Sequence, residues 1–148
     1  MPPDSDPTRV AFVCVANAGR SQMAAAFADR ELARRGLDGD VEVLSGGTDP
    51  ADAVHDVVVE AMAEVEADLR GTGPRAVSPD ELADVDVVVT MGCSAEGVCP
   101  ATWRGDARDW DLDDPKGRPL PAVREIRDDV ERRVTALFDE LAAGDPPD

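Results

Sequence analysis

The chain has 148 residues, the size of one ordinary domain, and its 43% content of hydrophobic residues excludes a compositionally disordered chain. Its 32 acidic residues against 15 basic ones give a net charge of −17. A chain with this negative charge repels nucleic acids and anionic membranes, and neither is expected as a partner. Repulsion between copies of the chain also favours a monomer. Any site that binds an anion must therefore be a strong local well of positive potential.

The cations are almost all arginine, since Lys116 is the only lysine. An acidic, lysine-poor composition resembles that of salt-adapted proteins, although an ordinary acidic protein from a GC-rich genome would also show it. No stretch approaches the ~20 apolar residues of a membrane span. The segment Met1–Thr8 lacks the basic and apolar regions of a signal peptide. We therefore expect a cytoplasmic protein, in which three cysteines are more often catalytic or redox-active than structural.

We expect a single domain over residues 9–143, between disordered tails at 1–8 and 144–148 that are rich in Pro and Asp. The apolar run Arg9–Val13 predicts a buried strand. A helix is predicted over Ser21–Arg35, with Gly36 at its C-terminal stop, and a second strand over Val41–Leu44. Apolar residues at helical spacing from Val54 to Leu69 predict a second helix.

In the second half of the chain, Ser78-Pro79-Asp80-Glu81 forms a capping box, which predicts the start of a short helix. Val85–Thr90 is the clearest strand, and another short strand is expected near Trp110–Leu112. A final helix carries an apolar stripe from Ile126 to Leu141. Alternating strands and helices predict an α/β domain with three layers, a parallel sheet and helices on both faces. In such folds the ligand lies beyond the carboxyl ends of the strands.

The loop Cys14–Ser21 follows the first strand directly and opens the first helix. Five residues between Cys14 and Arg20 can wrap their N–H groups around one tetrahedral oxyanion. The helix N-terminus adds partial positive charge, and Arg20 can hold two oxygens as a fork. The same field favours the thiolate of Cys14, which Ser21 can stabilise by a hydrogen bond, and Asn17 suits a left-handed backbone position. The oxyanion-binding residues are thus expected to be Cys14, Val15, Ala16, Asn17, Ala18, Gly19, Arg20 and Ser21.

The arrangement C-x-x-N-x-x-R-S resembles that of the low-molecular-weight protein tyrosine phosphatases and of the thioredoxin-coupled arsenate reductases that share their fold. Two further motifs match in order: Ser45-Gly46-Gly47-Thr48 resembles the family's Ser-Ala-Gly-Thr, and Asp114-Pro115 resembles the Asp-Pro that supplies the general acid. The resemblance implies a four-stranded parallel sheet of flavodoxin-like type. It also implies catalytic roles for Cys14, Arg20 and Asp114, the last as proton donor to the departing oxygen.

The two activities differ in the step that follows attack by Cys14. A phosphatase hydrolyses the cysteinyl-phosphate with water, whereas an arsenate reductase uses a second thiol, expels arsenite and leaves a disulfide. Cys93 and Cys99 resemble the reductases' M-G-C…C-P segment, ahead of a W-x-L-x-D-P pattern that ends at Asp114-Pro115. The resemblance implies that Cys93 attacks Cys14, that Cys99 then attacks Cys93, and that thioredoxin or a similar dithiol reduces the resulting disulfide.

The leading hypothesis is therefore an arsenate reductase, and the alternative is a phosphatase acting on a phosphomonoester. Lys116 follows Asp114-Pro115 where phosphatases usually place aromatic residues, which argues against an aryl-phosphate pocket. Some family members bind potassium through a glutamate on the first helix. This chain has Ala25 near that position, so no metal site is expected, and no cofactor is expected either. The lone His55 is expected on a solvated helix start, without a catalytic role.

Overall fold

The computed structural model describes residues 7–37, 39–69, 73–91, 106–113 and 115–143. The predicted site residues Cys93, Cys99 and Asp114 lie outside the described residues. So do the predicted tails, except for residues 7 and 8.

Four parallel strands form one sheet in the order β2-β1-β3-β4. Their bounds are Thr8–Cys14 for β1, Val41–Gly47 for β2, Val87–Met91 for β3 and Asp106–Asp109 for β4. The two central strands are buried along nearly their whole length, as expected for strands that helices cover on both faces. The predicted α/β fold with a four-stranded parallel sheet is confirmed.

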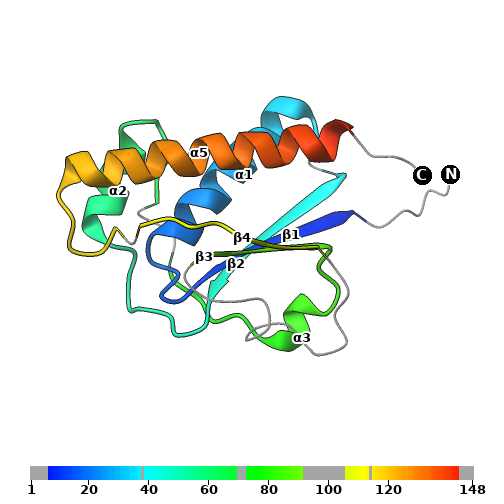
Figure 1. Cartoon of the computed structure of the whole chain (residues 1–148), viewed down its shortest axis with the longest axis horizontal. Coiled ribbons are helices and arrows are strands. Elements are labelled where there is room, and N and C mark those ends of the chain that lie inside the picture. The colour runs from blue at the N-terminus through cyan, green and yellow to red at the C-terminus, as the bar shows by residue number, and fades with distance from the viewer. Residues whose placement is uncertain (1–6, 38, 70–72, 92–105, 114, 144–148) are drawn as a thin grey trace, which may run out of the picture.

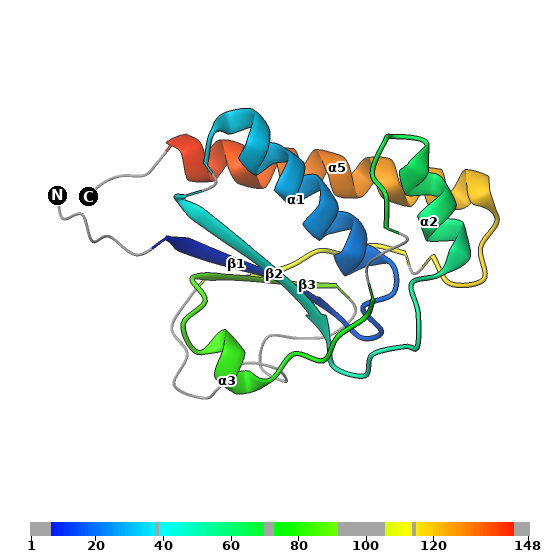
Figure 2. The same ribbon diagram turned by 180° about the vertical axis from the view of Figure 1, so that it is seen from behind.

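Among the described elements, α1 (Arg20–Arg35), α2 (Asp56–Ala63) and α5 (Leu120–Ala143) cover one face of this sheet (Figure 1). The short helix α3 (Pro79–Leu82) lies on the opposite side, as the view from behind also shows (Figure 2). Side chains of β1 alternate between two cores, because successive residues of a strand point to opposite faces. Phe12 and Cys14 belong to the large core, and Ala11 and Val13 pack with Leu82.

Most predicted elements are confirmed within a residue or a few residues of their expected bounds, including the capping box of Ser78 and Glu81 that opens α3. Three details were wrong. Strand β1 begins at Thr8, which pairs with Val41, so the predicted N-terminal tail is one residue too long. Helix α2 ends at Ala63, because the chain turns there and Glu66 takes a left-handed conformation with φ 66°. The last strand lies at Asp106–Asp109, and the Trp110–Leu112 segment that follows it is not a strand.

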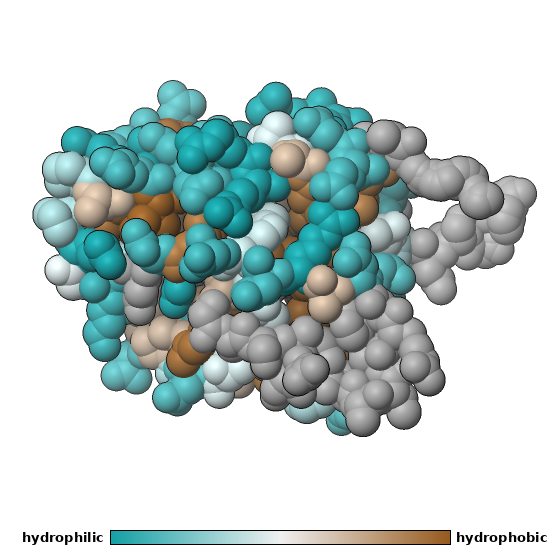
Figure 3. Space-filling view, in the orientation of Figure 1, coloured by the Kyte–Doolittle hydropathy of each residue, from teal (hydrophilic) through white to brown (hydrophobic). Residues whose placement is uncertain are grey.

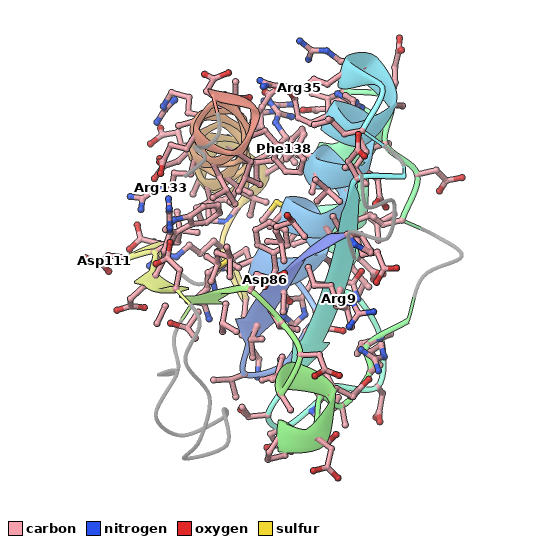
Figure 4. All side chains as sticks on the ribbon, turned by 90° about the vertical axis from the view of Figure 1, so that its right-hand side faces the viewer. Arg9, Arg35, Asp86, Asp111, Arg133 and Phe138 are labelled. Carbon is pink, nitrogen blue, oxygen red and sulfur yellow. The ribbon has the colours of Figure 1, made fainter. Side chains whose placement is uncertain are left out.

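Charged residues cover most of the outer face of α5 and its surroundings (Figure 3). Several of them join α5 to the rest of the fold through ion pairs. Arg35 of α1 contacts both Glu31 and Asp139, and it lies near Phe138 where the two helices meet (Figure 4). Glu64, just after α2, accepts from Arg124 and Arg127. These hydrogen bonds and charges, those of Arg124 first, lower the pKa of the Glu64 carboxyl to about 2.

Candidate active site

Cys14 ends β1 at the carboxyl edge of the sheet, between Gly47 of β2 and Met91 of β3 in the strand register. Its side chain is only 2% exposed. Helix α1 begins at Arg20, so the loop between strand and helix contains only residues 15–19. The first turn of α1 carries no acidic residue, and its positive end therefore faces the loop without a competing negative charge.

The backbone carbonyls of the loop are all turned outward and hydrogen-bonded. The segment that follows β2 runs along the loop and donates four backbone N–H groups to it, at distances of 2.8 to 3.1 Å. Gln22 and Met23 of α1 donate to two more loop carbonyls. The pairs, each written as donor and then accepting carbonyl, are Thr48 N–H and Cys14, Asp49 N–H and Val15, Ala51 N–H and Ala16, Gln22 Nε2 and Asn17, His55 N–H and Ala18, and Met23 N–H and Gly19. No carbonyl between Cys14 and Gly19 is therefore left to repel an anion inside the loop.

A trans peptide points its N–H opposite to its C=O, so outward carbonyls turn the loop N–H groups inward. The N–H of Asn17 shows this directly, since it donates to the Cys14 sulfur at 3.2 Å. Asn17 has φ 51°, the left-handed conformation predicted from its residue type. Gly47 permits the close approach of β2, because a Cβ there would lie 2.5 Å from the Val15 carbonyl oxygen. The loop thus forms a concave ring of N–H donors, which is a geometry that binds tetrahedral oxyanions.

A chain of buried hydrogen bonds also holds the Cys14 sulfur. Asn17 Nδ2 donates to Ser21 Oγ at 2.6 Å, and Ser21 Oγ lies 2.9 Å from the Cys14 sulfur. Since an amide nitrogen cannot accept, the Ser21 oxygen must accept from Asn17, which leaves its own proton for the sulfur. The orientation of the amide follows from its other end, because Asn17 Oδ1 accepts from Gln22 Nε2 and from the Arg75 backbone N–H. The network is therefore set to donate to a thiolate.

Arg20 links the loop to the segment that contains the predicted acid. Its Nη1 donates to the Leu112 carbonyl at 3.1 Å. On the other side of residue 114, Pro115 is buried against Gly19, where a Cβ would lie 2.6 Å from the Pro115 Cγ. Leu112 and Pro115, which flank positions 113 and 114 in the chain, are thus anchored to Arg20 and Gly19, and the contact with Pro115 requires a glycine at position 19.

A cavity of about 340 Å³ opens in front of the Cys14 sulfur. Besides the loop and Arg20, its lining includes His55, Lys116 and Asp49. His55 is half-buried at the N-terminus of α2, and this proximity to the loop was not foreseen from the sequence. The backbone role of Arg75 and the amide role of Gln22 were also missed. Only Gln22 left a signal, as a polar residue in the first turn of a helix whose sequence is otherwise alanine-rich on that side.

The described residues contain no group of three or more His, Cys, Asp or Glu side chains arranged to hold a metal ion. None of the helices in the described part of the chain is long and apolar enough to cross a membrane.

Comparison with known proteins agrees with this geometry. A protein of Halobacterium salinarum, provisionally named an arsenate reductase, is 56% identical over 93% of this chain and 96% of its own length. The thioredoxin-dependent arsenate reductase of Corynebacterium glutamicum superposes with a TM-score of 0.73 at 32% identity, over 92% of this chain and 62% of that one. An arsenate reductase in a phosphate-binding state gives a TM-score of 0.74 at 32% identity, over 89% of this chain and 97% of that one. The family model for low-molecular-weight phosphotyrosine protein phosphatases matches residues 9–145. The chain therefore belongs to the low-molecular-weight phosphotyrosine protein phosphatase family.

Proposed function

We propose that this protein is an arsenate reductase that converts arsenate to arsenite through the thiolate of Cys14. The observation that carries the proposal is the loop Cys14–Ser21, whose N–H groups face inward around a sulfur that already receives hydrogen bonds from Asn17 N–H and Ser21. The two arsenate reductase structures at 32% identity support arsenate as substrate, and the phosphate-binding state of one of them supports an oxyanion in this loop.

In the first step the Cys14 sulfur attacks arsenic and one arsenate oxygen leaves. Arg20 and the loop N–H groups hold the remaining oxygens, and the N-terminus of α1 stabilises their negative charge. The leaving oxygen needs a proton, because hydroxide departs more readily than oxide. We assign that proton to Asp114, because Leu112 contacts Arg20 and Pro115 packs against Gly19, so this short stretch of chain is held at the loop on both sides of Asp113 and Asp114.

In the second step a thiol must attack the Cys14 sulfur. The arsenic then leaves as arsenite with the electron pair of the sulfur–arsenic bond, and a disulfide remains. We assign this thiol to Cys93. Met91 is the register partner of Cys14, and neighbouring strands lie ~4.8 Å apart. Two further residues span at most ~7 Å, so the covalent chain holds the Cα atoms of Cys93 and Cys14 within ~12 Å of each other.

Cys99 would then attack Cys93, which frees Cys14 and leaves a Cys93–Cys99 disulfide. Closing a disulfide requires Cα atoms within about 7 Å, so each of the two cysteine pairs must meet this condition at its own step of the relay. Thioredoxin is the reductant that the Corynebacterium relative supports. A reductant of this kind supports a reaction in the cytoplasm, and the charge of −17 supports a monomeric protein of a salt-adapted cell.

The decisive experiment follows the disulfides by mass spectrometry after one addition of arsenate to reduced protein. The unmutated chain should end with Cys93 joined to Cys99. Cys99→Ser should complete one turnover and stall with Cys14 joined to Cys93. Cys93→Ser should release no arsenite, yet it should retain any hydrolysis of p-nitrophenyl phosphate, because that reaction uses water in place of a thiol. Full arsenate turnover by both variants would exclude the relay, and hydrolysis without arsenate reduction by the unmutated chain would exclude the reductase.

A further inference from the structure

The pocket in front of Cys14 contains one titratable side chain that the proposed chemistry does not use. His55 is the only histidine of the chain and lines the cavity together with Gly19 and Arg20. Its backbone N–H donates to the Ala18 carbonyl at 3.0 Å, which fixes the residue to the oxyanion loop. The backbone of residue 55 therefore lies in the wall of the pocket, whatever side chain it carries.

The imidazole of His55 is available to the pocket. It is half-buried, and although His55 is the N-cap residue of α2, its side chain makes no capping hydrogen bond. The ring carbon Cδ2 lies 3.6 Å from the position that a Cβ at Gly19 would occupy. The imidazole thus lies beside Gly19, the last residue of the loop before α1, and both residues line the cavity that opens at Cys14.

The electrostatic surroundings favour a cation at this position when an anion is bound. The charged groups that face the ring among the described residues are Arg20 of α1, Asp49 of the segment after β2, Lys116 beyond Pro115, and the adjacent Asp56 of α2. Two cations and two carboxylates leave the pocket wall without a large excess of either sign. A bound oxyanion then adds negative charge within a few ångströms of the ring.

We propose that His55 is an anion-binding residue, whose protonated imidazole contacts the bound oxyanion beside Arg20. The inference rests on the oxyanion-binding role proposed above and extends it. Arg20 holds the anion at all pH values, whereas His55 adds its contact only when it is protonated. Oxyanion affinity should therefore be higher at low pH, where the imidazole carries its proton, and a difference of about tenfold between pH 5.5 and 8.5 is expected for one such contact.

Because the chain has one histidine, its imidazole signals are resolved in a proton NMR spectrum without isotope labelling. The titration is best made in the Cys14→Ser chain, in which no thiolate competes with the anion. Sulfate is the probe, since it remains a dianion across the pH range and does not react. Adding sulfate at pH 5.5 should move the His55 ring signals to a saturating limit, because a bound anion that contacts the imidazole changes its surroundings.

Calorimetric sulfate affinities at pH 5.5 and 8.5 provide the second measurement. Cys14→Ser should bind about tenfold more tightly at the lower pH, and adding His55→Gln should remove most of this difference. Adding Asp52→Asn is the matched control, because Asp52 is exposed on the same segment, and it should preserve the difference. His55 ring signals that do not move when sulfate binds would overturn this inference alone. Failure of the unmutated chain to bind sulfate at either pH would overturn the proposed oxyanion site as well.

Discussion

Gly19 offers a test of the contact that anchors the Asp114-Pro115 segment to the oxyanion loop. In Gly19→Ala the new methyl group would lie 2.6 Å from the Pro115 Cγ, and a relaxed carbon–carbon contact is about 3.5–4.0 Å. The Pro115 Cγ must therefore move by about 1 Å, through a change of ring pucker or a shift of the backbone, at a position where the residue is buried. Overpacking of this kind costs about 1–3 kcal/mol.

A loss of about 2 kcal/mol corresponds to a fall in melting temperature of about 4–8 °C for a chain of this size. If the segment yields instead, Asp114 is displaced from the oxygen it must protonate, and a displacement of about 1 Å can lower kcat about 100-fold. Thermal unfolding and steady-state arsenate reduction together measure both outcomes. Gly39→Ala is the matched control, because nothing lies within 4 Å of its added Cβ, and it should change neither quantity appreciably. A Gly19→Ala protein with unchanged melting temperature and unchanged kcat would refute the packing argument.

Three further predictions concern the acid, the pH dependence of stability and the response to salt. Asp114→Asn should lower the rate of the first chemical step by about 10²–10⁴-fold while phosphate affinity changes little, and a larger loss in Asp113→Asn would show that the acid was assigned wrongly. The pKa of Glu64 is lowered from 4.5 to about 2, so its contribution to stability is present above about pH 4.5 and disappears as the pH falls through 2. Urea unfolding should therefore find Glu64→Gln less stable than the unmutated chain at pH 7, with a difference that shrinks between pH 4.5 and 2; a pH-independent difference would contradict the assignment. Raising the salt from 0.1 M to 1 M shortens the Debye length from about 10 Å to about 3 Å, so the melting temperature of a chain with a net charge of −17 should rise, and a flat response would exclude salt adaptation.

The sequence predicted the parts of the fold in which side-chain chemistry and backbone geometry agree. Strands β1 and β3 are buried on both faces, so they appear as runs of Val and other apolar residues. Strand β4 could not be found in this way, because among the described strands it lies at the edge of the sheet beside β3, and its sequence is Asp-Ala-Arg-Asp. The apolar signal instead came from Trp110 and Leu112, which are buried in a segment without regular structure.

In the candidate site, too, some features can be predicted from the types of side chain and others cannot. The oxyanion loop, the left-handed Asn17 and the position of the loop before a helix follow from residue type and spacing. The contacts that hold the loop in shape come mainly from backbone atoms of the segment after β2 and of Arg75, and a backbone N–H is the same in every residue except proline. Such contacts leave no pattern in a sequence. For the same reason the proximity of His55 to the pocket emerges only from the folded chain.

The outward carbonyls of the oxyanion loop determine how a bound anion affects the rest of the molecule. Because the ring of donors is already held by backbone hydrogen bonds, little conformational entropy is lost when an anion enters, and binding requires no induced closure of the loop. The free energy of binding is instead added to the stability of the folded state, by RT ln(1 + [L]/Kd). The backbone N–H groups of Thr48, Asp49, Ala51 and His55 donate to the outward carbonyls of the loop, so they are not available to the ligand. The hydrogen-exchange rates of these four amides should nevertheless fall when an oxyanion binds. Exchange at N–H groups that do not contact the ligand would then report whether the site is occupied.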